Sequence, residues 1–466
     1  MINKNIYKTQ LFFFLSIFLI IFFLFFSLIS LFFLYINFNF WSNFFFFFNK
    51  YNFFFFENIY SIFFYFFNNI SLNYIQIYYF PFIYIFILIT ILSIIFCLTY
   101  SFNEIIIFIF YVSLILFFGY LFFFTDSLIL FFLSYEMLLL PSFFILYKFA
   151  KTKRSIEAAY LMFFWTQFGA LFLLFSFIYL FFLTKTSNFW IINLYIFSKF
   201  EINFLFICWI IGFGVKLPIW PFYGWLPKAH VEASTNFSIF LSGVLVKFAF
   251  FGLFRCLVLL QTEPVFFFVF PFLTIGIVDS SFKLFYQIDL KKLVAYSTVL
   301  EMHWLTFCII SGLTPLILSS FCMLISHALL STNSFLLVDA INRRFKTRLI
   351  TEISGINYLC PKLFIIILLN LLIFLGFPGS IFFIAEFLFF SFFFDIFPVL
   401  TILFFIILYF LAPTFFFRSW MNTIFGSIRL FNKKIPLDLN KKEYFIFGNL
   451  IILMFWLGFS WQCFIF

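Results

Sequence analysis

The chain has 466 residues, of which 66% are hydrophobic and 9% are charged, and it carries a net charge of +10. A soluble globular domain usually has about 45–50% apolar and about 25% charged residues, so this composition excludes that class. The apolar residues form runs of about 20, the length at which a helix crosses a bilayer. We therefore expect an all-α polytopic membrane protein.

About fourteen apolar spans follow one another along the chain. The first is too long for the core of a signal peptide and lacks a small-residue cleavage site, so we expect it to be retained as a helix. The second is short and contains Glu57. The expected spans lie near residues 9–35, 53–68, 76–99, 104–124, 127–147, 157–183, 202–225, 237–259, 264–281, 291–311, 315–338, 362–392, 396–417 and 444–464.

Most basic residues lie in the loops that follow odd-numbered spans, in clusters at 148–154, 283–292, 343–362 and 418–442. Loops on the other side hold only Lys4, Lys8, Lys185 and Lys199. This alternation follows the positive-inside rule and predicts that the odd loops face the matrix or cytoplasm, with both termini on the opposite side. The positive charge therefore needs no nucleic-acid partner to explain it.

Two spans are interrupted by proline. Lys216 lies at membrane depth beside Pro218 and Pro221, and Phe377-Pro-Gly379 interrupts the span five places later, just before Glu386. A broken helix at membrane depth survives only inside protein or along a wet cavity. Discontinuous helices at corresponding positions are typical of inverted-repeat transporters. We therefore expect two inverted five-helix repeats with two discontinuous helices.

This organisation predicts four segments without a soluble domain. They are N-terminal transmembrane helices at 1–125, a first half at 126–260, a second half at 261–418, and a matrix-side loop with a final transmembrane helix at 419–466.

Seven of the ionisable residues within the spans are candidates for a function. An intramembrane charge costs about 2.5 kcal/mol or more, so it usually marks a pathway or a functional pair. Two explanations do not require an ion path: these residues could contact lipid headgroups, or they could form pairs that only hold helices together. Their spread over six spans with two broken helices favours an ion path. The candidates are Glu136, Lys216, Lys247, Glu301, His303, His327 and Glu386.

Glu136 has no cation within helical reach, so it needs a partner from another helix, and Lys216 is the best candidate. At about 4 Å and an effective dielectric near 20, such a pair gains about 4 kcal/mol. Burial opposes the charged lysine and the nearby carboxylate favours it, so the proton on Lys216 would depend on their separation. The pair is thus a hypothetical proton switch.

Several kinds of site are excluded by the sequence. The seven cysteines are scattered and never form a CxxC pair, so they offer no disulfide framework or iron–sulfur ligand set. The three histidines are far apart and indicate no metal site. A GxGxxG loop is also missing.

The interrupted span carries a further signal. The run Val215-Lys-Leu-Pro with Gly224-Trp-Leu-Pro-Lys-Ala-His-Val-Glu-Ala233 resembles the antiporter-like subunits of respiratory complex I. Further matches are Tyr135-Glu-Met-Leu-Leu-Leu-Pro141, Gly243-Val-Leu-Val-Lys, Asp289-Leu-Lys-Lys-Leu-Val-Ala-Tyr-Ser, Ile325-Ser-His-Ala-Leu and Phe377-Pro-Gly379. In this order the motifs are specific, and the resemblance covers roughly Asp126 to Arg418.

The resemblance implies a proton-translocating subunit of an NADH:ubiquinone reductase, without a redox centre or cofactor of its own. Flavin and iron–sulfur clusters are then expected in partner subunits, and the neighbours are other membrane subunits, especially antiporter-like ones, and lipid. The expected location is the mitochondrial inner membrane. The 100 phenylalanines, with abundant residues of AT-rich codons, also point to an AT-rich organelle genome.

By the same resemblance, Glu136 and Lys216 form the switch, Lys247 is the central relay, His327 is a further relay, and Glu386 is the terminal acid. Without the resemblance, Lys247 could be a lysine whose side chain snorkels to the membrane surface. His327 could likewise be a core histidine whose nitrogens are hydrogen-bonded within the protein. Arg255 is interpreted as structural.

The sequence departs from the family pattern at three places. Glu301-Met302 stands where the family has a histidine before methionine, and the histidine is displaced to His303. Tyr223 replaces a histidine and Ser234 a proline. Residues two apart lie about 200° apart on a helix, so without a distortion or a bridging water only one of Glu301 and His303 faces the proton path. We favour His303 as the carrier and Glu301 as the group that tunes it.

Two rival functions stay open at this point. A subunit of a multi-subunit cation/proton antiporter would share the charged motifs, and a structural membrane subunit could have kept the fold without pumping. His230 and Glu232 are interpreted as capping and packing residues.

The Glu136–Lys216 pair gives the first testable prediction. Lys216→Ala should abolish most coupled proton transfer while the protein still assembles, and Glu136→Gln should do similar harm. The double variant should lose less than the sum of the single losses because the two residues act as a unit. Proton transport by the reconstituted complex measures all three, and strictly additive losses would contradict the pair.

Overall fold

A computed structural model describes residues 83, 85–94, 102–149, 152–260, 267–396, 398–427 and 437–460. The spans expected at 9–35 and 53–68, and much of the one at 76–99, lie outside these residues. Within the described part, eight helices are long and apolar enough to cross a membrane. The all-α membrane class is confirmed, whereas the full number of spans stays a prediction.

The chain divides into two compact units, each described by itself. The first comprises Met1–Ser142 and Ser187–Ile191. Its helices include α4 (Phe102–Phe124) and α5 (Leu128–Met137), and the short α8 (Phe189–Ile192) begins within it. The backbone N–H of Leu128 donates to the Ser187 carbonyl at 2.7 Å, and that of Phe189 donates to the Asp126 carbonyl at 3.0 Å.

The span expected at 127–147 is split at Leu138, where α5 ends and α6 (Leu139–Lys148) begins. Pro141 explains the split, because proline lacks an N–H group and its ring crowds the carbonyl four residues earlier, at Met137. Glu136 lies in the last turn of α5, directly before the split.

The second unit, Phe143–Thr186 and Ile192–Phe466, holds the remaining helices. In chain order these are α7 (Lys153–Thr184), α9 (Lys199–Lys216), α10 (Trp225–Glu232), α11 (Thr235–Phe240), α12 (Val246–Leu259), α13 (Phe270–Phe285), α14 (Leu290–Ile310), α15 (Thr314–Phe345), α16 (Ile356–Leu359), α17 (Pro361–Phe374), α18 (Ile381–Ile396), α19 (Pro398–Phe405), α20 (Ala412–Ile424) and α21 (Lys441–Phe459).

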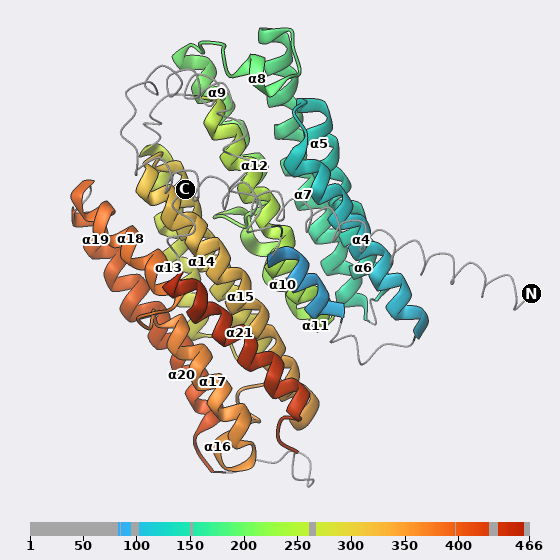
Figure 1. Cartoon of the computed structure of the whole chain (residues 1–466), viewed down its shortest axis with the longest axis vertical. Helices are drawn as coiled ribbons and strands as arrows, with labels where there is room; N and C mark the ends of the chain where they lie inside the picture. The colour runs from blue at the N-terminus through green and yellow to red at the C-terminus, as the bar shows by residue number, and fades with distance from the viewer. Residues whose placement is uncertain are drawn as a thin grey trace, which may run out of the picture. The chain divides into compact units, whose positions relative to one another are not determined.

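Helices α14 and α15 form the centre of the second unit. Nearly every residue of α14 and most residues of α15 are buried. They pack against each other, and α13 and α10 cover α14 while α18, α17 and α21 cover α15 (Figure 1). Because both helices are buried on nearly all sides and carry polar and ionisable residues such as Glu301 and His327, they lie inside the bundle rather than at a lipid-facing surface.

The first expected interruption is present. Helix α9 ends at Lys216, and α10 begins at Trp225 after a short 3₁₀ turn, Phe222–Gly224. Pro218 cannot donate to the Gly214 carbonyl, which accepts from the N–H of Ile219 at 3.0 Å instead. The Val215 carbonyl accepts from the indole Nε1 of Trp225 at 2.8 Å. The break therefore survives at membrane depth because its freed carbonyls find donors within the protein.

The second interruption separates α17, which ends at Phe374, from α18, which begins at Ile381. Gly376 (φ 70°) and Gly379 (φ 91°) adopt the left-handed conformation that glycine accepts without strain. A Cβ atom on Gly376 would overlap the Glu386 carboxyl, so glycine also leaves room for that side chain.

Two helical stretches contain a π-helical segment, in which backbone hydrogen bonds reach one residue further than in an α-helix. Leu241–Leu245 joins α11 to α12, and Ile406–Leu411 joins α19 to α20. Each follows an interrupted helix in the sequence. This recurrence is consistent with the expected repeats, whose mutual orientation stays a prediction.

Candidate functional site

Lys247 lies in the first turn of α12, directly after the π segment, and none of its surface is exposed. Its Nζ atom lies 2.6 Å from Nδ1 of His327 on α15. It also donates to the backbone carbonyl of Ser242, which belongs to the π segment. Lys247 is therefore held by the protein interior and does not snorkel to a surface.

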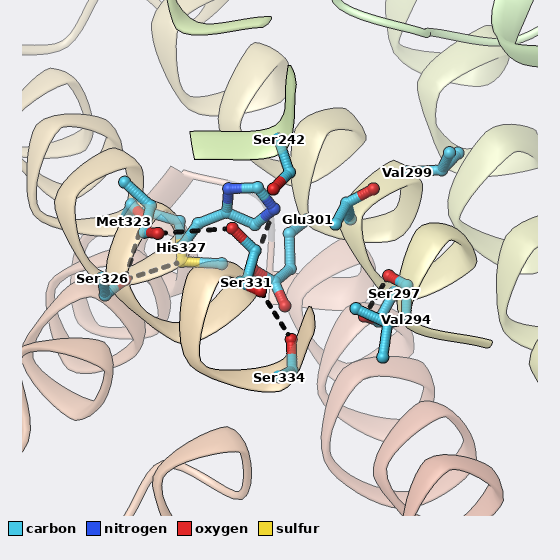
Figure 2. A network of polar contacts seen from close by, with 12 residues as sticks. Ser242, Val294, Ser297, Val299, Glu301, Met323, Ser326, His327, Ser331 and Ser334 are labelled. Atoms are coloured by element: carbon cyan, nitrogen blue, oxygen red, sulfur yellow. Dashed lines mark hydrogen bonds and ion pairs between the residues drawn. The ribbon is translucent and has the colours of Figure 1, made fainter. Parts of the chain in front are cut away.

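Glu301 on α14 extends this contact to a third ionisable group. Its Oε2 atom lies 3.8 Å from Nε2 of His327, and both residues are 1% exposed. Figure 2 shows the His327 ring beside Ser242 and Glu301. When Lys247 is protonated, its ammonium group donates a hydrogen bond to Nδ1 of His327. The neutral His327 ring then carries its own proton on Nε2, which faces Glu301. The three groups form a row from α12 through α15 to α14.

Glu386 continues the buried ionisable groups on α18, at 4% exposure. Its Oε2 atom accepts a 2.7 Å hydrogen bond from the hydroxyl of Tyr409, which belongs to the second π segment. Helix α18 packs against α15, the helix that carries His327. The hydroxyl of Ser319 on α15 donates to the Ala385 carbonyl at 2.7 Å and fixes α18 against the central helix.

The geometry does not support the preference for His303 over Glu301 as the proton carrier. Nε2 of His303 accepts from the backbone N–H of Trp220 at 2.7 Å, and Nδ1 lies 2.7 Å from the Val299 carbonyl. Its ring packs against Gly276, where a Cβ atom would overlap it. Both ring nitrogens are thus occupied by backbone groups of the helix break and of α14 itself. Because residues two apart face opposite sides of a helix, Glu301 faces the row and His303 faces the break.

The other departure, Tyr223, lies beside His303, with ring centroids 6.1 Å apart. Its hydroxyl donates to Asp279 on α13 and accepts from Lys283, which forms a 2.7 Å ion pair with Asp279. Tyr223 and His303 therefore attach the broken segment to α13 and α14 respectively.

Glu136 and Lys216 belong to different compact units. Each side chain is half-buried. Their pairing therefore stays a prediction.

His230 is a buried ionisable residue that the sequence analysis assigned to packing. Its ring stacks on Phe335, with centroids 4.8 Å apart, and none of its surface is exposed. Neither ring nitrogen has a hydrogen-bond partner among the described residues. It lies within electrostatic reach of Lys247 and His327. The available signal was its place on the helix directly after the break.

Within the described ranges, no group of three or more His, Cys, Asp or Glu residues could hold a metal ion. The row itself consists of amine, imidazole and carboxyl groups, all of which can hold or release a proton.

A family model described as NADH:quinone oxidoreductase/Mrp antiporter, TM, matches residues 125–412. The chain belongs to this family. NADH-ubiquinone oxidoreductase chain 4 of Paramecium tetraurelia is 38% identical over 329 residues, which are 70% of this chain and 69% of the relative. The resemblance to antiporter-like subunits is thereby confirmed, as is its narrower form, homology to the fourth subunit.

Two solved structures have the same fold. A chain of the Mrp complex from Dietzia sp. DQ12-45-1b has a TM-score of 0.71 at 15% identity, covering 82% of this chain and 81% of that one. A chain of respiratory complex I from Thermus thermophilus with bound aureothin has a TM-score of 0.68 at 17% identity, covering 82% and 83%. The fold is thus shared by antiporter and respiratory subunits alike.

The different surroundings of Glu301 and His303 give a testable prediction. Glu301→Gln keeps the shape but cannot exchange a proton, so it should reduce proton transport strongly, by about 10²-fold. His303→Gln keeps an acceptor for the Trp220 N–H and should retain most transport. Proton transport by the reconstituted complex distinguishes the two variants. A larger loss in His303→Gln, at equal assembly, would restore His303 as the carrier.

Proposed function

We propose that this chain is a proton-translocating membrane subunit of a respiratory complex that transfers electrons from NADH to ubiquinone. One observation carries the proposal: Lys247, His327 and Glu301, all from different helices, form a contiguous buried row. Such groups are costly inside a membrane and are retained where protons move. Homology to chain 4 of NADH-ubiquinone oxidoreductase supports the respiratory assignment.

In the proposed mechanism the row transfers protons from one group to the next and is itself unchanged after each cycle. Protonated Lys247 gives a proton to Nδ1 of His327, which releases its Nε2 proton toward Glu301. The proton then passes from Glu301 to Glu386 through bridging water, and Tyr409 holds the Glu386 carboxyl. The proposal keeps Glu136 and Lys216 as the switch, as the sequence analysis predicts.

The electron-transfer steps belong to partner subunits in this proposal. The flavin and iron–sulfur clusters are expected there, and this chain contributes no redox group. Its proposed neighbours are other antiporter-like membrane subunits and lipid in the mitochondrial inner membrane. The exposed apolar side chains of α7, among them Phe164, Phe175 and Phe182, provide a surface suited to such surroundings.

The second candidate is a subunit of a multi-subunit cation/proton antiporter, favoured by the fold shared with the Mrp complex. The two functions differ in what purifies with the chain. Flavin- and iron–sulfur-containing subunits with NADH-oxidising activity would support the respiratory complex, and a complex without them would support the antiporter. A purely structural role is disfavoured by the buried row, which packing does not require.

Lys247 provides the decisive variant. Lys247→Met removes the only amine of the row while approximating its length, so proton transport by the reconstituted complex should fall by about 10²-fold or more. Lys199→Met, at the exposed start of α9, is the matched control and should transport normally. Normal transport by an assembled Lys247→Met complex would refute the proposed relay.

A further inference from the structure

A second buried lysine lies outside the row described above. Lys291 is in the first turn of α14 and is only 3% exposed. Its Nζ atom donates to the carbonyl of Ala233 at 2.5 Å, at the C-terminal end of α10. Lysine side chains are almost never this deeply buried unless they are paired, so the position of Lys291 requires an explanation.

The surroundings of Lys291 connect it to water. The carboxyl of Asp289 accepts from the backbone N–H of Lys291 at 2.9 Å and forms a 2.8 Å ion pair with Arg348. The side chains of Arg348 and Asp289 are 35% and 17% exposed. Arg348 is the nearby charge with the largest effect on Lys291, and Asp339 and Glu232 also interact with it electrostatically. Lys291 thus lies directly beneath a charged surface, on the side that the basic loops assign to the matrix.

The surroundings also connect Lys291 to the row. Ala233 is three residues after His230, so the carbonyl that Lys291 holds lies one turn beyond that imidazole. His230 stacks on Phe335 of α15, the helix that carries His327, and it interacts electrostatically with both Lys291 and Lys247. Neither nitrogen of His230 is hydrogen-bonded within the part of the chain that the structure describes. A fully buried imidazole with both nitrogens available is suited to accept a proton on one and release it from the other.

We infer that Lys291 is the proton-uptake residue of this half of the protein and that it feeds the row through His230. The inference rests on the proposed function. The Lys291 ammonium releases a proton to one nitrogen of His230 through a bridging water and regains one from the aqueous side beside Asp289. His230 releases the proton on its other nitrogen toward Lys247 and His327. No electron is transferred and each group returns to its starting state.

The competing explanation is that Lys291 only holds the end of α10, because a cation at a helix C-terminus satisfies free carbonyls and the helix dipole. Arg348 supplies a matched case. Its Nη1 atom donates to the Val231 carbonyl at 3.1 Å, also in the last turn of α10. Arg348 therefore shares the structural task but, being partly exposed and permanently protonated, cannot act in a relay.

The test compares three variants in the reconstituted complex, with proton transport expressed per assembled complex. Lys291→Arg retains a cation and a donor for Ala233 but cannot release a proton, so transport should fall at least about tenfold. His230→Phe keeps a ring to stack on Phe335 and should show a similar loss. Lys292→Gln removes a neighbouring half-buried cation from the same turn of α14 and should transport normally.

Normal transport in Lys291→Arg would overturn the inference. Equal losses in Lys291→Arg and Lys292→Gln would also overturn it, because they would show that any change in this turn of α14 impairs transport. Lys247→Met separates this failure from failure of the proposed function. If it abolishes transport while Lys291→Arg does not, only the uptake assignment fails. If it too transports normally, the relay itself is wrong.

Discussion

The cost of charge inside a bilayer is the constraint on which the structure depends. Lys247, Glu301 and Glu386 are nearly inaccessible to solvent, yet each has a polar or ionisable neighbour from another segment. Removing one partner of a buried pair leaves an uncompensated charge, which is strongly destabilising. The helices that carry these residues must therefore stay together, and this explains why α14 and α15 occupy the centre of their unit.

Irregular backbone segments help to meet the cost of these buried charges. The π segment before α12 places the Ser242 carbonyl within reach of the Lys247 ammonium, and the one before α20 places Tyr409 against Glu386. The break after α17 leaves space at Gly376 for the Glu386 carboxyl. Helix distortions inside a membrane are tolerated where the protein re-satisfies the backbone, and here they also position the ionisable side chains.

Local sequence was sufficient to predict part of this arrangement. Pro218 and Pro378 interrupt helices wherever they occur, so both breaks follow from a few neighbouring residues. Long apolar runs likewise predict the described helices of the second unit, and the cost of burial identifies Lys247, Glu301 and Glu386 as unusual. These inferences need no knowledge of which residues meet across the fold.

Contacts between distant segments could not be predicted in this way. The sequence allowed either Glu301 or His303 to face the row, and the choice depends on the rotation of α14 and on the Trp220 N–H, 83 residues away from His303. His230 was assigned to packing because its unoccupied nitrogens and its nearness to Lys247 appear only in three dimensions. The span expected at 127–147 is present as Leu128–Lys148, but the junction of α5 and α6 within it was not predicted, although Pro141 is a local signal for it.

The central claim is that the buried row changes its protonation during turnover. Infrared difference spectroscopy of the reconstituted complex, recorded as it oxidises NADH, observes carboxyl groups directly. The account predicts a carboxyl band that appears or disappears with turnover, is lost in Glu301→Gln and is retained in Glu232→Gln. Identical difference spectra for Glu301→Gln and the unaltered complex would contradict it.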